Sequence, residues 1–210
     1  EVKVPVKDVA NASFWQGNPL SVYEWYKPPE LIQDHHTGQG KAFPTFGYEC
    51  LVAEIEVDMK TGFVNVEKVT ASHDVGTAVN PALCKGQIYG GIVMGLGFAL
   101  MEEVDIEDGQ VKTLNLDSYL IPTSMDAPEM VVNLFESDDD SGSFGAKSLG
   151  EPATEAVAAA VANAIYNAIG RRIRHNPADL EKVLLGRKLV KPVKKDGEQA
   201  TDVKPAGGAL

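Results

Sequence analysis

The sequence predicts an α+β domain with mixed sheets and packed helices. Apolar and acidic residues alternate toward the end of residues 51–58 and again over 63–69, which indicates two strands with one wet face each. Two later segments, 86–103 and 153–169, are apolar over helical lengths. Strands followed by helices, with tight turns rather than regular strand–helix alternation, favour this class over a doubly wound fold.

The first two strands form a predicted hairpin, because Lys60-Thr61-Gly62 between them is a turn sequence. A second hairpin is expected around Asp108-Gly109, a dipeptide typical of two-residue turns. The remaining expected elements are a third strand over 70–73, short strands at 104–107 and 110–113, a strand over 130–136, and a short helix from Asn176 to near Leu185.

The apolar helix over 86–103 contains five glycines, each of which lowers helix propensity by up to about 1 kcal/mol. Such a cost is tolerated where close packing on a neighbouring element or on a ligand offsets it. The sequence leaves both explanations open for these glycines, which stand at positions 86, 90, 91, 95 and 97.

Three regions are expected along the chain. Residues 1–45 are proline-rich and lack sustained periodicity, so they are predicted to form an irregular arm that wraps a partner chain. Residues 46–187 form the predicted α+β domain. Residues 188–210 are rich in lysine, proline and glycine and are expected to be a flexible tail.

Composition narrows the functional classes. The formal net charge is −11, so the chain lacks the basic surface expected of a nucleic-acid-binding protein. Cys50 and Cys84 cannot form a disulfide framework and are expected to be buried free thiols, which is typical of cytoplasmic proteins. The apolar stretch 88–101 is too short and too glycine-rich for a membrane span, so a cytoplasmic location is predicted.

The segment 141–152 is a glycine-spaced loop that leads to Glu151 and Pro152. Proline suits the first position of a helix, and Gly170 is expected to end that helix. Glu151 would then lie at the helix N-terminus, where the helix dipole favours its ionised form and keeps it available as a base. Taken alone, the same position is also explained by helix capping.

Several familiar site patterns fit poorly. Gly95-Leu96-Gly97 lacks the third glycine of a dinucleotide fingerprint, and the segment around Lys147 lacks the spacing of a phosphate loop. The adjacent His35 and His36 point in different directions on any element, so a zinc site is not expected. Ser148 does not lie in the elbow motif of a serine hydrolase.

A longer set of motifs resembles one family, the molybdenum hydroxylases of the xanthine dehydrogenase/aldehyde oxidase type. The chain looks like the C-terminal part of their molybdopterin-binding subunit, from about Gly38 to about Ile173. The motifs, in the family's order, are Thr37-Gly38-Gln39-Gly40, Glu54-Ile55-Glu56-Val57-Asp58, Thr61-Gly62, Asp74-Val75-Gly76-Thr77-Ala78-Val79-Asn80-Pro81, Gly86-Gln87-Ile88-Tyr89-Gly90-Gly91, Gly95-Leu96-Gly97-Phe98-Ala99-Leu100-Met101-Glu102-Glu103 and Gly150-Glu151-Pro152.

This resemblance implies specific roles. Glu151 matches the family's active-site glutamate, the base that deprotonates a hydroxyl ligand on molybdenum. Gln87 matches a glutamine that hydrogen-bonds the pterin. The loop residues Lys147, Ser148, Leu149 and Gly150 match the segment whose backbone lies against the cofactor. No side chain of this chain is expected to ligate the metal.

The resemblance also implies partners. The cofactor would be molybdopterin with molybdenum, with the cytosine dinucleotide form left open, and [2Fe–2S] clusters and FAD would lie on partner chains or domains. The expected partners are the rest of the molybdenum subunit, an iron–sulfur subunit and a flavin subunit, in a higher hetero-oligomer without nucleic acid.

The reaction implied is hydroxylation of an N-heterocycle, purine-like, or of an aldehyde, with water as oxygen source. Two alternatives stay open: a non-catalytic assembly subunit, and a reductive relative that acts on an aromatic thioester.

Overall fold

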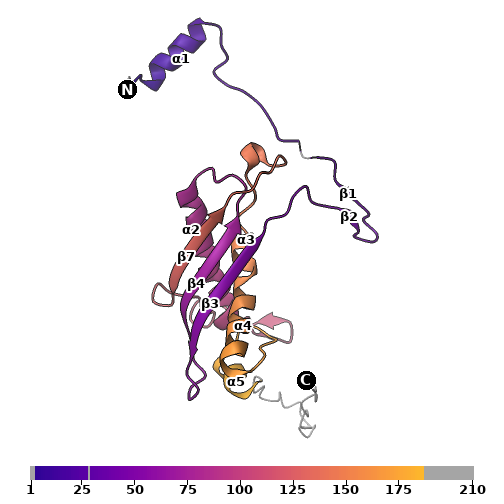
Figure 1. Cartoon of the computed structure of the whole chain (residues 1–210), viewed down its shortest axis with the longest axis vertical. Helices are drawn as coiled ribbons and strands as arrows, with labels where there is room; N and C mark the ends of the chain where they lie inside the picture. The colour runs from indigo at the N-terminus through magenta and orange to yellow at the C-terminus, as the bar shows by residue number, and fades with distance from the viewer. Residues whose placement is uncertain (1–2, 28, 187–210) are drawn as a thin grey trace.

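The computed structural model describes residues 3–27 and 29–186. Its central layer is a sheet with strand order β3–β4–β7, formed by β3 (Glu49–Val57), β4 (Val64–Asp74) and β7 (Glu129–Phe135). The predicted tail 188–210 lies outside the described residues. The α+β class predicted from the sequence is confirmed by helices and mixed sheets in this arrangement (Figure 1).

The first predicted hairpin is confirmed, because β3 and β4 pair antiparallel around the turn at residues 58–63. A bulge interrupts the ladder, since Glu54 pairs with Lys68 whereas Ile55 pairs with Val66. The separate third strand expected over 70–73 was wrong. Those residues continue β4, because alternation persists across the bulge and the strand keeps its inner face buried to Asp74.

β7 pairs with β4 in parallel, a relation that the hairpin pattern did not predict. Parallel neighbours need a crossover, and here the crossover contains α2 (Pro81–Leu100). The strand β7 itself matches the one expected over 130–136 to within a residue at each end. The central sheet therefore combines one hairpin with one strand–helix–strand unit.

α2 and α4 (Val157–Ile169) cover the same face of the sheet, with α4 behind β3 and α2 behind β4 and β7 (Figure 1). Side chains from these helices and from the inner face of the sheet form one core. Its most deeply buried large members are Ile88, Ile92, Ile165, Val69, Val157, Val161 and Val183.

α2 begins five residues before the predicted start at 86. Asn80 explains the earlier start, because its side chain accepts a hydrogen bond from the Leu83 amide at 3.1 Å and Pro81 occupies the first turn. By length and composition the resulting helix could cross a membrane. It packs instead against the sheet, with Ile88, Ile92 and Leu96 in the core, as a core helix does.

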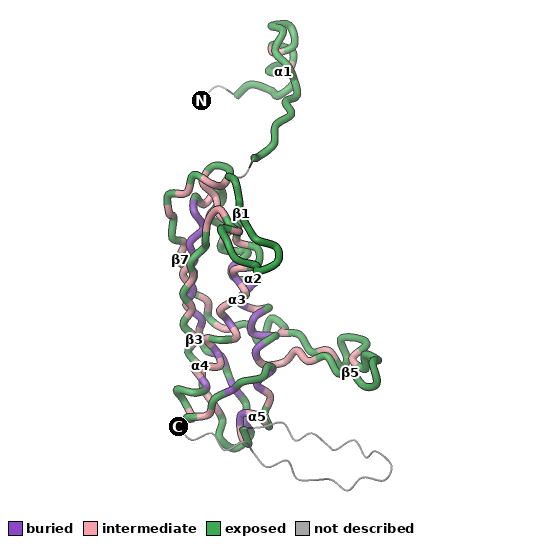
Figure 2. The backbone as a smooth tube through the Cα atoms, turned by 90° about the vertical axis from the view of Figure 1, so that its right-hand side faces the viewer, coloured by how far each residue is buried: buried purple, intermediate pink, exposed green. Residues whose placement is uncertain are grey.

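The N-terminal region contains α1 (Val6–Trp15) and two short paired strands, β1 (Ile32–Gln33) and β2 (Gly40–Lys41). α1 lies apart from the sheet and helices, and nearly all of residues 3–27 are exposed (Figures 1 and 2). A ten-residue helix within a segment expected to be irregular is a difference from the prediction. The exposed aromatic residues of this region include Phe14, Trp15, Tyr23, Trp25 and Tyr26.

The smaller elements largely follow expectation. The second hairpin is confirmed by β5 (Ile106–Glu107) and β6 (Gln110–Val111), with Asp108 and Gly109 both at positive φ. The expected short helix is α5 (Leu180–Leu185), which starts later than predicted. The cysteines are free, but Cys50 is exposed and Cys84 half-buried, so the expectation of burial was wrong. Cys50 lies on the wet face of β3, where alternate residues point to solvent.

Candidate functional site

The glycine-spaced loop before Glu151 is joined to the end of β4 by backbone contacts. Thr77 donates its N–H to the Gly145 carbonyl at 2.8 Å, and Lys147 donates its N–H to the Val75 carbonyl at 3.0 Å. Gly76 has a φ of 59°, and a Cβ there would lie 2.1 Å from the Gly145 oxygen. Glycine is therefore required at position 76 for both conformation and space. The loop itself passes through the short helix η1 (Ser143–Gly145).

A cluster of charged side chains lies beneath this junction. The Lys147 ammonium is 2.6 Å from an Asp74 carboxylate oxygen and 3.8 Å from one of Asp139, and it donates to the Phe46 carbonyl at 3.0 Å. We call these four residues the Lys147 cluster. The side chains of Lys147, Asp74 and Asp139 are at most 9% exposed. The cluster is thus an interior ion-pair network.

Hydrogen bonds keep the carboxylates of the Lys147 cluster ionised. Burial alone would raise the pKa of Asp74, but hydrogen bonds from Lys147, Ser137 and the Gly76 amide outweigh it, and the net pKa is lowered. The Ser141 and Thr45 hydroxyls and the Ser141 amide lower the pKa of Asp139 to about 2. The hydrogen bond to Asp74 raises the pKa of Lys147. All three groups are therefore charged at neutral pH.

Two of the α2 glycines serve helix packing. A Cβ on Gly91 would lie 2.5 Å from the Ala153 Cβ, and one on Gly95 would lie 2.4 Å from the Val157 Cβ. The second contact lies four residues later than the first in both partners, from Gly91 to Gly95 and from Ala153 to Val157. The helix α2 therefore runs parallel to α3 (Pro152–Glu155) and to the start of α4. For Gly91 and Gly95, the choice left open by the sequence is decided in favour of packing.

Gly86 and Gly90 differ from Gly91 and Gly95 in their surroundings. Among the described residues, nothing lies within 4 Å of a Cβ built at position 86 or 90. They share one exposed stripe of α2 with Gln87, and the stripe continues through Leu83, Met94 and Phe98, which are 69%, 62% and 55% exposed. Gln87 is one turn before Gly91, so it lies at the end of α2 from which α3 also starts. The exposed stripe leaves room for a large planar ligand beside the Gln87 amide.

Glu151 immediately precedes α3, with Pro152 in the first turn as predicted. Its carbonyl accepts the Thr154 amide at 3.0 Å, while in the described part of the chain its carboxylate makes no capping hydrogen bond. The side chain is exposed. The single helix expected over 153–169 is interrupted at Ala156, so the dipole beside Glu151 comes from four residues and is weaker than the sequence suggested.

The structure separates the predicted loop residues into two groups. Lys147 turns its ammonium inward to the cluster, and Leu149 is partly buried against the core. Ser148 and Gly150 are exposed, and a Cβ on Gly150 meets nothing within 4 Å among the described residues. Ser148, Gly150 and Glu151 therefore present an open surface at the same end of the helix pair as Gln87.

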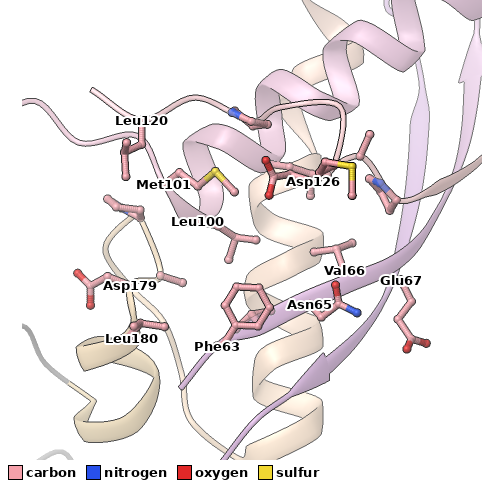
Figure 3. A pocket seen from close by; sticks show the side chains of 18 of the residues that line it. Phe63, Asn65, Val66, Glu67, Leu100, Met101, Leu120, Asp126, Asp179 and Leu180 are labelled. Carbon is pink, nitrogen blue, oxygen red and sulfur yellow. The ribbon is translucent and has the colours of Figure 1, made fainter. Parts of the chain in front are cut away.

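A large cavity lies elsewhere. It has a volume of about 620 Å³ and lies between the C-terminal end of α2, the start of β4 and the start of α5 (Figure 3). Leu100, Met101, Leu120 and Leu180 line it beside Asp126 and Asp179. Within the described part of the chain, its lining includes neither Gln87 nor residues 147–151. We place the candidate site at the open surface, because Gln87, Glu151 and the small residues Gly86, Gly90 and Gly150 are exposed at that end of the helix pair.

Sequence reasoning missed the roles of Asp74 and Asp139. Both were visible, Asp74 in a quoted motif and Asp139 in an acidic run, but Asp74 pairs with a lysine 73 residues away. It also missed His73, which is buried next to Glu49, with its Nδ1 3.3 Å from a Glu49 carboxylate oxygen. Burial lowers the pKa of His73 and raises that of Glu49.

Within residues 3–27 and 29–186, no group of three or more His, Cys, Asp or Glu is arranged to hold a metal ion.

Comparison with known protein families places this chain in a class. The model of the molybdopterin cofactor-binding domain family matches residues 1–128, more than half of the chain. The chain therefore belongs to this family, within the molybdenum hydroxylases of the xanthine dehydrogenase and aldehyde oxidoreductase type. The matched residues include Gln87 and the α2 glycines, whereas residues 147–151 lie beyond them.

Individual relatives agree with this family. A putative xanthine dehydrogenase molybdenum-binding subunit of Escherichia coli is 38% identical over 136 residues, 64% of this chain and 18% of that protein. The nicotine 6-hydroxylase large subunit of Paenarthrobacter nicotinovorans is 31% identical over 192 residues, 90% of this chain and 23% of that protein. The crystal structure of the aldehyde oxidoreductase from Desulfovibrio desulfuricans superposes with a TM-score of 0.68 at 37% identity, over 74% of this chain and 17% of that chain.

The chain therefore spans about a fifth of the length of the relatives it matches. The residues present fit a molybdopterin at the open surface. Gly86, Gly90 and Gly150 leave space that a Cβ would narrow, and Gln87 offers both a donor and an acceptor.

Proposed function

We propose that this chain forms the part of a molybdenum hydroxylase active site that contains the catalytic base, Glu151. The observation that supports this proposal most directly is that Gln87, Ser148, Gly150 and Glu151 are all exposed at the same end of α2 and α3, in a chain of the molybdopterin-binding family. The reaction is oxidative hydroxylation of an aldehyde or an N-heterocycle. Water supplies the oxygen, and two electrons and two protons leave for each C–H bond converted to C–OH.

When bound, molybdopterin with its molybdenum supplies the two-electron redox chemistry of this reaction. The residues of this chain supply positioning and proton transfer. The Gln87 amide holds the edge of the pterin, to which it can donate and from which it can accept. The backbone of Ser148, Leu149 and Gly150 lies along the cofactor. Glu151 accepts the proton that must leave water before its oxygen can act as a nucleophile.

The remaining parts of the machinery are assigned to other polypeptide segments. The rest of a molybdenum subunit would complete the pocket and select the substrate, and iron–sulfur and flavin partners would carry the electrons away. The exposed aromatic residues of the N-terminal region support contact with such a partner, because exposed apolar surface of this extent marks interaction sites.

The test is Glu151→Gln in the assembled complex, with Glu155→Gln as the matched control. Both glutamates are exposed and lie four residues apart. Loss of general-base catalysis typically lowers turnover by about 10²–10⁴-fold. We expect that loss for Glu151→Gln with an aldehyde, a purine or quinoline as substrate, at unchanged molybdenum content, and near-normal turnover for Glu155→Gln.

Unchanged turnover of Glu151→Gln would refute the proposal. An assembly role without catalysis would show as an intact complex in which neither substitution changes any activity. A reductive role would show as electron-dependent reduction of an aromatic thioester by the complex, without hydroxylation of the other substrates.

A further inference from the structure

The direction of the Lys147 side chain is the observation on which this inference depends. Its ammonium has three N–H donors. It donates hydrogen bonds to Asp74 at 2.6 Å and to the Phe46 carbonyl at 3.0 Å, and it forms an ion pair with Asp139 at 3.8 Å. The side chain is 8% exposed. The Lys147 ammonium is therefore directed to the protein interior and not to the open surface.

The acceptors come from three separate parts of the fold. Phe46 precedes β3, Asp74 is the last residue of β4, and Asp139 lies in the segment after β7. Asp74 is itself fixed, because it accepts from the Ser137 hydroxyl at 2.7 Å and from the Gly76 amide at 3.1 Å. The Lys147 cluster thus connects the loop to all three strands of the sheet at one end.

The stretch between Lys147 and Ala153 is held at both ends. Lys147 fixes its start, and Ala153 is buried against Gly91 of α2. Five residues, 148–152, span these two fixed points, and they include Ser148, Gly150 and Glu151. The path of so short a segment is determined by its ends, so the place of the Glu151 backbone depends on the ion pair behind it.

We infer that Lys147 is a positioning residue: its ion pairs with Asp74 and Asp139 set the orientation of the loop that carries Glu151, and its ammonium does not contact the cofactor. This inference rests on the proposed function. It assigns a role to the Lys147 side chain, for which the family resemblance implies only a backbone contact with the cofactor, and it leaves the cofactor-facing role to the loop backbone.

The test compares Lys147→Met, Lys147→Arg and Asp74→Asn in the assembled complex, with Lys112→Met as the control. Lys112 is an exposed lysine beside β6 whose nearest carboxylate, Glu107, is 4.0 Å away. A displacement of about 1 Å at a catalytic group can cost about 100-fold in rate. We expect Lys147→Met to lower kcat by roughly 10- to 100-fold, with KM and molybdenum content within about twofold of the parent.

Asp74→Asn is the decisive variant. Asp74 lies behind the loop, and its substitution weakens the same ion pair from the partner's side without changing Lys147. It should reproduce the loss of kcat, and its effect should not add to that of Lys147→Met, since residues of one ion-pair network are coupled. Lys147→Arg should recover most of the rate, because a guanidinium can pair with both carboxylates. Lys112→Met should leave kcat unchanged.

Other outcomes would overturn the inference. Loss of molybdopterin in Lys147→Met but not in Asp74→Asn would show that the ammonium binds the cofactor directly. Parental kcat in Lys147→Met, beside an inactive Glu151→Gln, would remove the positioning role and leave the proposed function intact. If Lys147→Met does not assemble, the kcat of Asp74→Asn and of Asp139→Asn decides the matter, and parental rates in both would refute the inference.

Discussion

The adjacent glycines Gly90 and Gly91 allow the packing of α2 to be tested with a matched pair of substitutions. In a helix interior, replacing glycine by alanine gains about 1 kcal/mol from backbone entropy. That gain is common to Gly90→Ala and Gly91→Ala, so it cancels in their difference. The new methyl group meets nothing within 4 Å at Gly90 among the described residues, whereas at Gly91 it would lie 2.5 Å from the Ala153 Cβ and 2.7 Å from the Ala153 carbonyl oxygen.

The clash at Gly91 has no easy relief. Nonbonded carbon atoms favour separations of about 3.5–4.0 Å, so the overlap is roughly 1 Å. One of the atoms in contact is a backbone oxygen, which cannot rotate away, and α2 must therefore move from α3. Overpacking of a well-packed core costs about 1–3 kcal/mol. Gly90→Ala should be more stable than the parent by about 1 kcal/mol, and Gly91→Ala less stable than Gly90→Ala by about 1–3 kcal/mol.

Thermal unfolding followed by far-ultraviolet circular dichroism measures this difference. For a chain of this size, 1 kcal/mol shifts Tm by about 2–4 °C. We expect Gly90→Ala to unfold about 2–4 °C above the parent and Gly91→Ala roughly 2–12 °C below Gly90→Ala. Equal stability of the two variants would refute the packing geometry.

In the assembled complex, Gly90→Ala should lower molybdopterin content, if the open surface of α2 receives the pterin.

Two further predictions concern single residues. Gly76→Ala should lower the free energy of unfolding by more than about 2 kcal/mol, because both its φ of 59° and the Gly145 oxygen at 2.1 Å oppose a side chain. Gly109→Ala is its control, with a φ of 75° but no described neighbour within 4 Å, and equal losses in urea unfolding would rule out the clash. Burial lowers the pKa of His73 from 6.5, so the unfolded chain binds this proton more readily and stability should decrease as pH falls below that value. His73→Asn should flatten this decrease in urea unfolding between about pH 7 and pH 5, and an unchanged slope would assign it to another group.

The sequence predicted best the elements whose signals are local. The β3–β4 hairpin followed from period-two alternation on both sides of a turn, and the end of α4 followed from Gly170, which has a φ of 70°. The parallel pairing of β4 with β7 could not be predicted in this way. The paired strands are separated by the whole of α2, and no local pattern states which distant strand a strand will join.

In the candidate site, too, features with local sequence signals were predicted and features that depend on distant residues were not. The start of α3 directly after Glu151 was predicted from the sequence, whereas α2 begins five residues before its predicted start. Whether a glycine of α2 faces a helix or open space depends on the residue across from it, so Gly90 and Gly91 could not be distinguished without coordinates. The direction of the Lys147 side chain depends on Asp74, a residue that is distant in sequence. Sequence motifs thus located the loop but did not indicate the direction of its lysine side chain.

The exposure of Glu151 has a consequence for how these residues can be studied. A catalytic base acts in a pocket from which water is largely excluded. In this chain Glu151 is exposed, as are Met94 and Phe98 of α2, and the chain spans 18% of its xanthine dehydrogenase-type relative. Under the proposed function, the cover over Glu151 would come from other polypeptide segments. Substitutions at Gly76 and Gly91 should change the stability of the isolated chain, whereas Glu151→Gln should change only the turnover of the complex. A residue that changes both, as we expect for Lys147, links the fold to the chemistry.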